Sequence, residues 1–330
     1  CMETAKAVAM EAGIYKPGDL AVTNDEFEAM SDEKVKEIIP QLRVISRCSP
    51  NTKLRLVTLA QEIGMSVAMT GDGVNDAPAL KKADVGFGMQ DGSDVAKEAA
   101  DIVLTDNNFA SVVKAVELGR TFMHNIMMFL EFQLPINISL LILSMAFPII
   151  SGGSALLAAV QILIVNIIMD SLNSLSFGGE PPKEEYMNEK PIMKGSGLFI
   201  RGAKGRIALS SIVFIVLFGV ITFGPIGKMF TTKTSTMTAR FALLCLMAVF
   251  NGFTIRTDSM NPFKGIKNNK LFMYIAFGIF AMTVVLCNFV GNLVQTTPMT
   301  IDQWIVVLVT AFMVVPVDWI RKAICKKGCN

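Results

Sequence analysis

Two carboxylates and one amide lie within five residues on a short turn, at Asp72, Asn75 and Asp76. Their oxygens are hard donors, which Mg²⁺ takes together with the oxygens of a phosphate group. Gly71 and Gly73 flank the first of them and are expected to allow positive φ and a close approach of the backbone. An Asx-rich surface turn is the alternative, because the same residue types dominate ordinary turns. The density of oxygen donors favours a phosphate and metal site.

Lys53 lies immediately before a helix that the sequence predicts over residues 54–63. It ends the string Ser-Pro-Asn-Thr-Lys at residues 49–53, which follows an extended segment at residues 44–46. A lysine in the first turn after a strand can reach a bound phosphate as a point charge. A solvated surface lysine is the alternative.

Short apolar segments alternate with short helical patterns around both groups. Residues 66–69 form an apolar run directly before the acidic turn, and open α/β sheets bind ligands at the carboxyl ends of their strands. After the turn, the sequence predicts a helix and a strand over residues 77–89, a helix over residues 93–100 and a strand over residues 101–104. This alternation argues for a parallel, doubly wound α/β sheet.

The chain as a whole is more apolar than an ordinary soluble domain. The mean hydropathy is +0.50 and 52% of the residues are hydrophobic, although charged residues occur throughout residues 1–120. A membrane span needs about 20 apolar residues, and six stretches qualify, so membrane lipid is an expected partner. The stretches are residues 126–150, 156–177, 207–223, 239–255, 271–294 and 304–320.

Lysine and arginine in the connections between spans predict the orientation in the membrane. The connections after the second, fourth and sixth spans are basic, whereas the opposite side has basic residues in only one loop. The basic side and the first part of the chain are therefore expected to face the cytoplasm. The basic residues after the second span are Lys183, Lys190, Lys194, Arg201, Lys204 and Arg206. The net charge of +2 gives no signal of a nucleic-acid partner.

Asp170 is an ionisable residue inside the second span, where a charge is costly and functional by default. Asn166 precedes it by four residues, so both side chains are expected on one face of a helix. Ser171 and Asn173 follow and are expected to loosen the helix, which would free backbone carbonyls for an ion. A hydrogen-bonded pair between helices is the alternative. The lack of a basic residue nearby in the sequence favours an ion ligand.

The sequence resembles the C-terminal portion of P-type cation-transporting ATPases, whose phosphorylation domain has a haloacid-dehalogenase-like fold. Residues 69–80 match the hinge motif of that family, and residues 49–53 fit its Pro-x-x-Lys element. The resemblance implies an ATP-driven pump in which Mg²⁺ assists an aspartyl-phosphate intermediate. The implied roles are Mg²⁺ ligation by Asp72 and Asp76, orientation of the metal and the phosphate by Asn75 and Asp76, contact with phosphoryl oxygens by Lys53, and a phosphate loop of Thr70, Gly71 and Gly73.

One departure from the family pattern concerns the nucleophile. The family carries it in an Asp-Lys-Thr-Gly-Thr string, which this chain lacks, and Asp106 is followed by Asn-Asn-Phe instead. We therefore expect a fragment that cannot hydrolyse ATP alone, with the nucleophilic Asp, two further cytoplasmic domains and four membrane helices in a missing N-terminal portion. The expected domains are the C-terminal part of the phosphorylation domain and the start of a stalk helix at residues 1–118, and a six-helix transmembrane domain at residues 119–330. The stalk helix is expected to continue into the first span.

Two spans resemble those of calcium pumps of the plasma-membrane and secretory-pathway types. Residues 165–170 are similar to the sixth membrane helix of these pumps, and residues 132–139 are similar to the fifth. By that resemblance, Asn137 joins Asn166 and Asp170 as a ligand or supporting group of the ion. The implied cargo is Ca²⁺, and the implied location is the plasma membrane, in a multi-pass protein.

The same resemblance sets expectations for the ion path and the stoichiometry. Pro135 is expected to interrupt the first span, and Glu131 and Gln133 either line the access path of the ion or reach toward the interface. Pumps with two calcium sites carry glutamates where this chain has Leu140 and Ala248, so one Ca²⁺ per cycle is implied.

Two alternatives to a calcium pump stay open. The cargo could be manganese, sodium or protons, since Mn²⁺ accepts oxygen ligands much as Ca²⁺ does. An alternative of a different class is a non-catalytic truncated membrane protein that scaffolds or regulates an intact pump.

Overall fold

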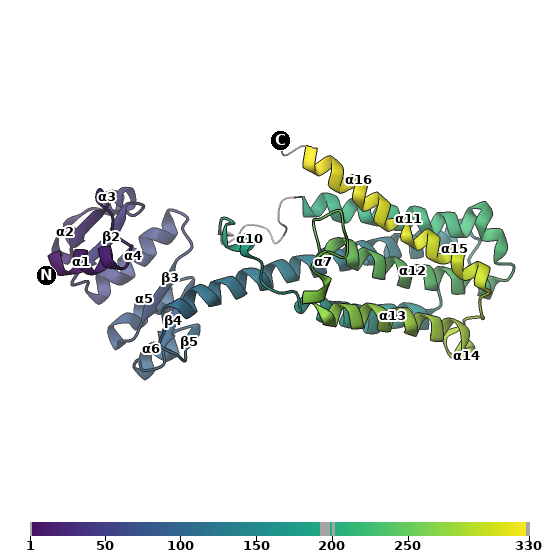
Figure 1. Ribbon diagram of the computed structural model, residues 1–330, viewed down its shortest axis with the longest axis horizontal. Helices are drawn as coiled ribbons and strands as arrows, with labels where there is room; N and C mark the ends of the chain where they lie inside the picture. Colours follow the sequence, from purple (N-terminus) through teal and green to yellow (C-terminus); the bar gives the residue numbers. More distant parts are fainter. Residues whose placement is uncertain (1, 192–198, 200–201, 328–330) are drawn as a thin grey trace. The chain divides into compact units, whose positions relative to one another are not determined.

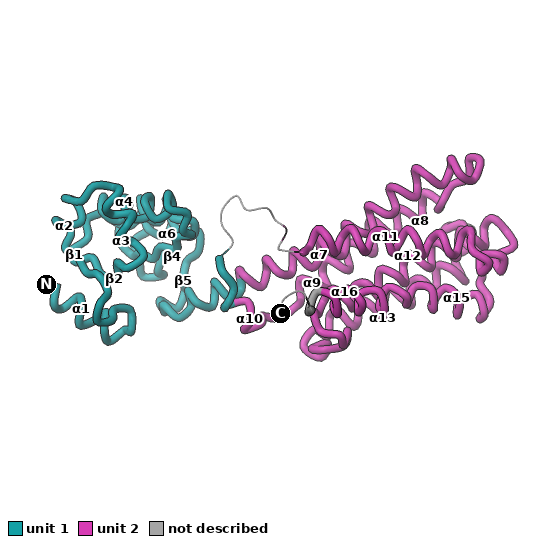
Figure 2. The backbone as a smooth tube through the Cα atoms, turned by 90° about the horizontal axis from the view of Figure 1, so that it is seen from above, with its two compact units in different colours: residues 1–118, 187–196 teal, residues 119–186, 197–330 magenta. Residues whose placement is uncertain are grey.

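The computed structural model describes residues 2–191, 199 and 202–327 (Figure 1). The chain divides into two compact units (Figure 2). Unit 1 comprises residues 1–118 and 187–196, and unit 2 comprises residues 119–186 and 197–330. Lys194 and Arg201, two of the basic residues used to predict the orientation, lie outside the described residues.

The first part of unit 1 contains a two-stranded parallel sheet and four helices. Its elements are α1 (Met2–Glu11), β1 (Leu20–Thr23), α2 (Asn24–Ala29), α3 (Asp32–Ile38), β2 (Leu42–Ser46) and α4 (Pro50–Glu62). β1 and β2 pair in parallel, with Leu20 opposite Leu42 and Thr23 opposite Ser46. The fully buried Phe27 of α2 packs in the core beside this sheet.

The second part of unit 1 contains a three-stranded parallel sheet, as the alternation of helices and strands predicted. Its elements are β3 (Ala68–Gly71), η1 (Val74–Asp76), α5 (Ala77–Lys82), β4 (Val85–Met89), α6 (Asp94–Ala99) and β5 (Ile102–Leu104). The strand order is β3-β4-β5. Within the described part of the chain, β2 pairs only with β1 and β3 only with β4, so each keeps one edge without a strand partner.

Three helices of unit 1 begin at serine caps, namely Ser31 for α3, Ser49 for α4 and Ser93 for α6. Ser49 accepts a hydrogen bond from the backbone N–H of Thr52 at 3.1 Å, and Pro50 occupies the first helical position. α4 therefore begins earlier than the predicted residue 54. Ser93 caps α6 in the same way.

α7 is a continuous helix of 41 residues, Ala110–Ile150. The prediction that a stalk helix continues into the first span is thereby confirmed. The prediction that Pro135 interrupts this span is wrong, because both Pro135 and Pro148 lie inside the helix. A proline removes one backbone donor, and membrane helices tolerate this where neighbouring groups satisfy the freed carbonyl.

Unit 2 is a bundle of helices that run alongside one another (Figure 1). Six helical stretches of the described residues are long and apolar enough to cross a membrane, which confirms the predicted number of spans. After α7, the helices are α8 (Ala159–Ile164), η2 (Val165–Met169), α9 (Asp170–Gly178), α10 (Glu184–Met187), α11 (Ala203–Phe223), η3 (Pro225–Met229), α12 (Lys233–Ile255), η4 (Ile266–Asn268), α13 (Lys270–Asn288), α14 (Gly291–Val294), α15 (Ile301–Phe312) and α16 (Val314–Lys327).

α12 is the central helix of the bundle. Its apolar window is 83% buried, whereas those of the other five spans are 28–39% buried. The fifth span ends at Asn288 and not at the predicted residue 294, because the chain turns there. Asn288 donates its side-chain N–H to the carbonyl of Val284, and the hydroxyl of Thr296 donates to that of Leu286. These side chains satisfy carbonyls of the last helical turn, so the helix can stop.

Candidate active site and ion site

Lys53 and Asp76 form an ion pair that joins α4 to η1 in unit 1. The Nζ atom of Lys53 lies 2.5 Å from Oδ1 of Asp76, and the backbone N–H of Gly73 donates to Oδ2 of the same carboxylate at 3.2 Å. The Asp76 side chain is 9% exposed. Both residues were predicted as site residues from separate segments, and the structure brings them together.

Hydrogen bonds from α2 position the first turn of α4. The backbone N–H of Ser49 donates to Oδ1 of Asn24 at 2.9 Å. The hydroxyl of Thr52 lies 2.8 Å from both Oδ1 of Asn24 and Oε1 of Glu28. The Thr52 hydroxyl and then that of Ser49 hold the pKa of Glu28 below its ordinary value. These contacts fix the turn from which Lys53 extends.

Neither glycine of the acidic turn has positive φ, and only Gly71 is required by close packing. Neither Gly71 nor Gly73 is among the residues with positive φ, so that expectation is wrong. A Cβ atom on Gly71 would lie 2.4 Å from Cβ of Asp76. The turn therefore requires glycine at position 71 because the Asp76 side chain occupies the space.

Asp72 and Asn75 present their side chains at the surface of the same turn. Both are exposed, and neither forms a side-chain hydrogen bond or ion pair within the described residues. The backbone of Asp72 is held by Ser93, whose N–H donates to the Asp72 carbonyl at 2.8 Å. The backbone of Asp72 is thus held in place, and its carboxylate is available to a cation.

The donor set at this turn fits Mg²⁺ that is shared with a phosphate group. Among the described residues, no cluster of three or more His, Cys, Asp or Glu side chains could hold a metal by itself. Mg²⁺ commonly uses only one or two carboxylates and completes its shell with water and substrate phosphates. Asp72 is the free carboxylate, whereas both oxygens of Asp76 are engaged by Lys53 and Gly73.

The pKa of Asp76 reflects two opposing causes. Burial raises the pKa of this carboxyl, but the Lys53 ammonium and the N–H of Gly73 favour the charged form. The net pKa lies below the ordinary value for aspartate. Asp76 is therefore ionised at neutral pH and keeps its partnership with Lys53.

Asp170 lies directly after a π-helical turn in unit 2. Residues Val165–Met169 form this turn between α8 and α9. π-Helical turns are rare and occur frequently at functional sites. The predicted loosening of the helix is thus a wider turn at Asn166 and not an unwound segment at Ser171 and Asn173, since Asn173 donates to the carbonyl of Met169 within the helix.

The three predicted ion ligands differ in how much of each side chain is exposed. Asp170 is half-buried and accepts a hydrogen bond from the side-chain N–H of Gln133 in α7. Asn137 and Asn166 are exposed, and within the described residues no side-chain hydrogen bond joins either of them to Asp170. Asp170 has no ion-pair partner in that part of the chain. The pair expected to share one face, Asn166 and Asp170, therefore lies in different environments.

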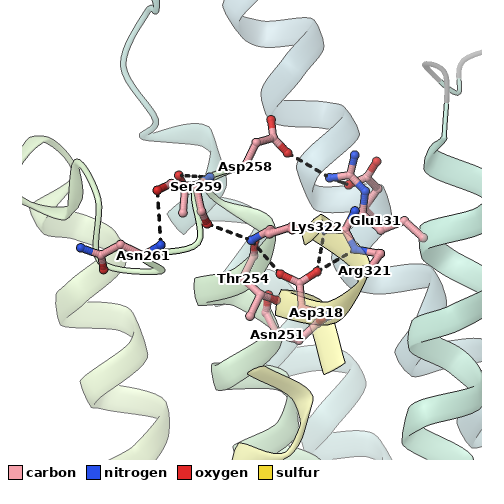
Figure 3. Close-up of polar contacts among 11 residues, drawn as sticks. Glu131, Asn251, Thr254, Asp258, Ser259, Asn261, Asp318, Arg321 and Lys322 are labelled. Carbon is pink, nitrogen blue, oxygen red and sulfur yellow. Dashed lines mark hydrogen bonds and ion pairs between the residues drawn. The ribbon is translucent and has the colours of Figure 1, made fainter. Parts of the chain in front are cut away.

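Two further expectations about the membrane region can be compared with the structure. Leu140 and Ala248, which stand where a second ion site would need carboxylates, are buried at 7% and 3% exposure. Glu131, which was expected to line the access path or to reach toward the interface, is also buried and pairs with Arg206 of α11 at 2.9 Å (Figure 3).

A buried polar cluster that joins segments next to α9, α12 and α13 to α7 was not found from the sequence. Glu180 follows α9 and pairs with Arg256 after α12 at 3.2 Å, with both side chains at most 3% exposed. Asn269 donates to Oε1 of Glu180 at 2.8 Å, and Asn125 of α7 donates to its backbone carbonyl at 3.2 Å. Each member of the cluster lies in a different segment of the chain, so no local pattern in the sequence indicates it.

The fold and these sites define a multi-pass membrane protein that also contains part of a haloacid-dehalogenase-like domain. The family described as cation transporting ATPase, C-terminus, matches residues 154–324. The family of haloacid dehalogenase-like hydrolases matches residues 55–116. The chain belongs to the cation-transporting ATPases and corresponds to their C-terminal portion.

Curated relatives match nearly the whole chain. Calcium-transporting ATPase 4, plasma membrane-type, of Arabidopsis thaliana is 36% identical over 314 residues, which cover 92% of this chain and 30% of the relative. Plasma membrane calcium-transporting ATPase mca-1 of Caenorhabditis elegans is 39% identical over 341 residues, covering 94% and 27%. Calcium-transporting ATPase 2 of Schizosaccharomyces pombe is 37% identical over 319 residues, covering 95% and 25%. The chain thus spans 25–30% of the length of these relatives.

Proposed function

We propose that this chain works as the C-terminal part of an ATP-driven calcium pump of the plasma membrane, which moves one Ca²⁺ per cycle. The names of the relatives support the cargo and the membrane. The coverage of about a third or less of each relative supports a longer working protein, whose N-terminal portion is the partner of this chain. The proposed domains are residues 1–118 and residues 119–330.

The observation that carries the proposal is the setting of Asp170. A half-buried carboxylate without an ion-pair partner among the described residues follows a π-helical turn in a membrane helix. An ionisable group in that position is costly and marks an ion pathway by default. Asn137 in the first span and Asn166 in the second span are exposed. Further helices of the full pump can pack against them, and the two amides would then complete the ligand set with Asp170. The buried apolar residues Leu140 and Ala248 support a single site.

The acidic turn of unit 1 is proposed as part of the phosphorylation site, with ATP as the substrate. Asp72 would ligate Mg²⁺, Asn75 would orient the phosphate, and Thr70, Gly71 and Gly73 would form the loop around it. Asp76 would hold Lys53 toward the phosphoryl oxygens and contribute its charge to the metal site. Mg²⁺ supplies neutralisation of the phosphoryl charge when bound.

The edges of β2 and β3 that have no strand partner among the described residues support a position beside them for the nucleophilic aspartate of the full pump. The motif that would carry this residue is absent from the chain. β2 leads into the turn that bears Lys53, and β3 leads into the turn that bears Asp72. A further parallel strand from the rest of the pump could pair with these edges and end beside both turns, since parallel strands present their carboxyl ends on one side of a sheet.

The test is Asp170→Asn in the full-length pump, because this change keeps the shape of the side chain and removes its charge. Ca²⁺-stimulated ATPase activity is expected to fall to background, and equilibrium binding of ⁴⁵Ca to the parent protein is expected to give one ion per pump. Full Ca²⁺ stimulation in the variant would overturn the site. Stimulation of the parent protein by Mn²⁺ or Na⁺ without Ca²⁺ binding would move the proposal to another cation.

A further inference from the structure

Gln133 of α7 is the side chain that contacts Asp170. Its Nε2 atom donates a hydrogen bond to Oδ2 of the Asp170 carboxylate, across two different spans. α7 and α9 are far apart in the sequence, so this bond fixes the position of one span against the other at the level of the proposed ion ligand. A charged acceptor makes such a bond stronger than one between neutral groups.

The two groups joined by this bond each keep an oxygen without a partner. Oδ1 of Asp170 and Oε1 of Gln133 are both buried, and neither accepts a hydrogen bond within the described residues. Leaving buried acceptors unsatisfied costs free energy. A carboxylate oxygen and an amide oxygen are also the ligand types that Ca²⁺ takes in proteins. A hard cation would therefore satisfy both atoms.

The neighbouring Glu131 shows that this feature is local to one face of α7. Two residues along an α-helix differ in direction by about 200°, and Glu131 accordingly contacts a different partner. It pairs with Arg206 of α11 at 2.9 Å, and Arg206 also lies 3.8 Å from Asp258 (Figure 3). α7 is thus held on one side by an ion pair and on the other by the bond from Gln133 to Asp170.

We propose that Gln133 is a further residue of the ion site, which orients Asp170 through its N–H and supplies its own Oε1 to the cation. This inference rests on the proposed function of Asp170. Gln133 would thus contribute to the affinity for the ion. The resemblance to calcium pumps did not imply this role. Gln133→Met keeps the length of the side chain and removes both the donor and the acceptor, whereas Gln133→Glu keeps an oxygen at the same reach.

The experiment measures Ca²⁺-dependent ATPase activity of the full-length pump over a range of Ca²⁺ concentrations. In Gln133→Met, the Ca²⁺ concentration for half-maximal activity is expected to rise by roughly tenfold or more, with an unchanged KM for ATP. A loss of folded protein would lower the maximal rate and leave the half-maximal concentration unmoved. Gln133→Glu keeps an oxygen that a cation can use and is expected to stay nearer the parent than Gln133→Met does.

Glu131→Gln is the matched control, since it alters a buried side chain of the same helix that contacts Arg206 instead of Asp170. It is expected to leave the half-maximal Ca²⁺ concentration unchanged, and an equal rise there would show an effect of helix placement and overturn the proposal. A lower half-maximal concentration in Gln133→Met would also overturn it, because the amide would then compete with the ion. If Asp170→Asn abolishes activation while Gln133→Met leaves the affinity unchanged, only the role of Gln133 fails. If Asp170→Asn leaves activation intact, the proposed ion site fails as well.

Discussion

The ammonium of Lys53 lies 2.5 Å from the carboxylate of Asp76, and this ion pair joins the turn after β2 to the turn after β3. The two turns belong to different sheets of unit 1, and neither β2 nor β3 pairs with the other within the described residues. The ion pair is therefore a direct side-chain connection between the two halves of the proposed phosphorylation site. Its integrity should matter both for the stability of unit 1 and for the chemistry that we propose there.

Lys53→Met should destabilise unit 1 by about 1–3 kcal/mol, because it leaves the buried Asp76 acceptor without its donor. Asp76→Asn should cost less, and the double variant should cost less than the sum of the two single changes. Hydrogen exchange of the amides of β3 and α4 in the full-length protein measures these differences. Additive costs would show that the two side chains do not interact in solution.

The stability of unit 1 should depend on acid pH through Asp76. Its pKa is lowered in the folded protein, so the carboxylate stabilises the fold above the unfolded value of about 3.9. This contribution is lost as the pH falls through the lower folded pKa. Lys53→Met removes a cause of the lowering, so acid unfolding should begin at a higher pH, as followed by pepsin cleavage within unit 1. Lys34→Met, which breaks an exposed ion pair with Glu37, is the control and should leave the onset unchanged.

Asp72→Ala in the full-length pump should abolish Mg²⁺-dependent formation of the phosphoenzyme and leave unit 2 folded. The exposed carboxylate has no hydrogen bond or ion pair in the described part of the chain, so its removal should not destabilise the turn. Acid-stable incorporation of ³²P from labelled ATP is the measurement, and heat stability in detergent is the control for folding. Normal phosphoenzyme levels would contradict the assignment of Asp72 to the metal.

Glu180→Ala should destabilise unit 2 by about 3–5 kcal/mol, because the buried Arg256 would lose its counter-charge. Glu180→Gln keeps a carbonyl oxygen that can accept from Asn269 and should be milder. The midpoint of thermal unfolding of the purified protein in detergent separates the two variants. Equal midpoints for Glu180→Ala and the parent would mean that water reaches Arg256 and that the pair is not buried in the membrane protein.

The predicted orientation can be tested by labelling single cysteines in intact cells. A cysteine at Thr231, in the exposed segment before α12, should react with an impermeant maleimide from outside. A cysteine at Lys190, on the basic connection after the second span, should react only after the cells are opened. The basic residues of the cytoplasmic connections give the reason for this expectation. The opposite pattern of labelling would reverse the topology.

The number of membrane spans followed from the sequence alone. The spans could be read because a membrane helix is defined by the length and composition of one continuous segment. The same is true of the strands and helices around Asp72, since turn residues and caps act within a few positions. The wrong expectations at this level, an interruption at Pro135 and positive φ at Gly71, concern positions where packing overrides residue preference.

Contacts between segments distant in the sequence were decided only by the tertiary structure. No local pattern relates Gln133 to Asp170 or Glu180 to Arg256, because the members of each pair lie in different segments that meet only when the helices pack. The π-helical turn before Asp170 is likewise invisible in a periodicity that assumes a regular helix. The sequence by itself therefore determined which residues could perform the chemistry. Packing of the helices decided which of those side chains meet, because burial and partner choice depend on neighbours that the chain order does not specify.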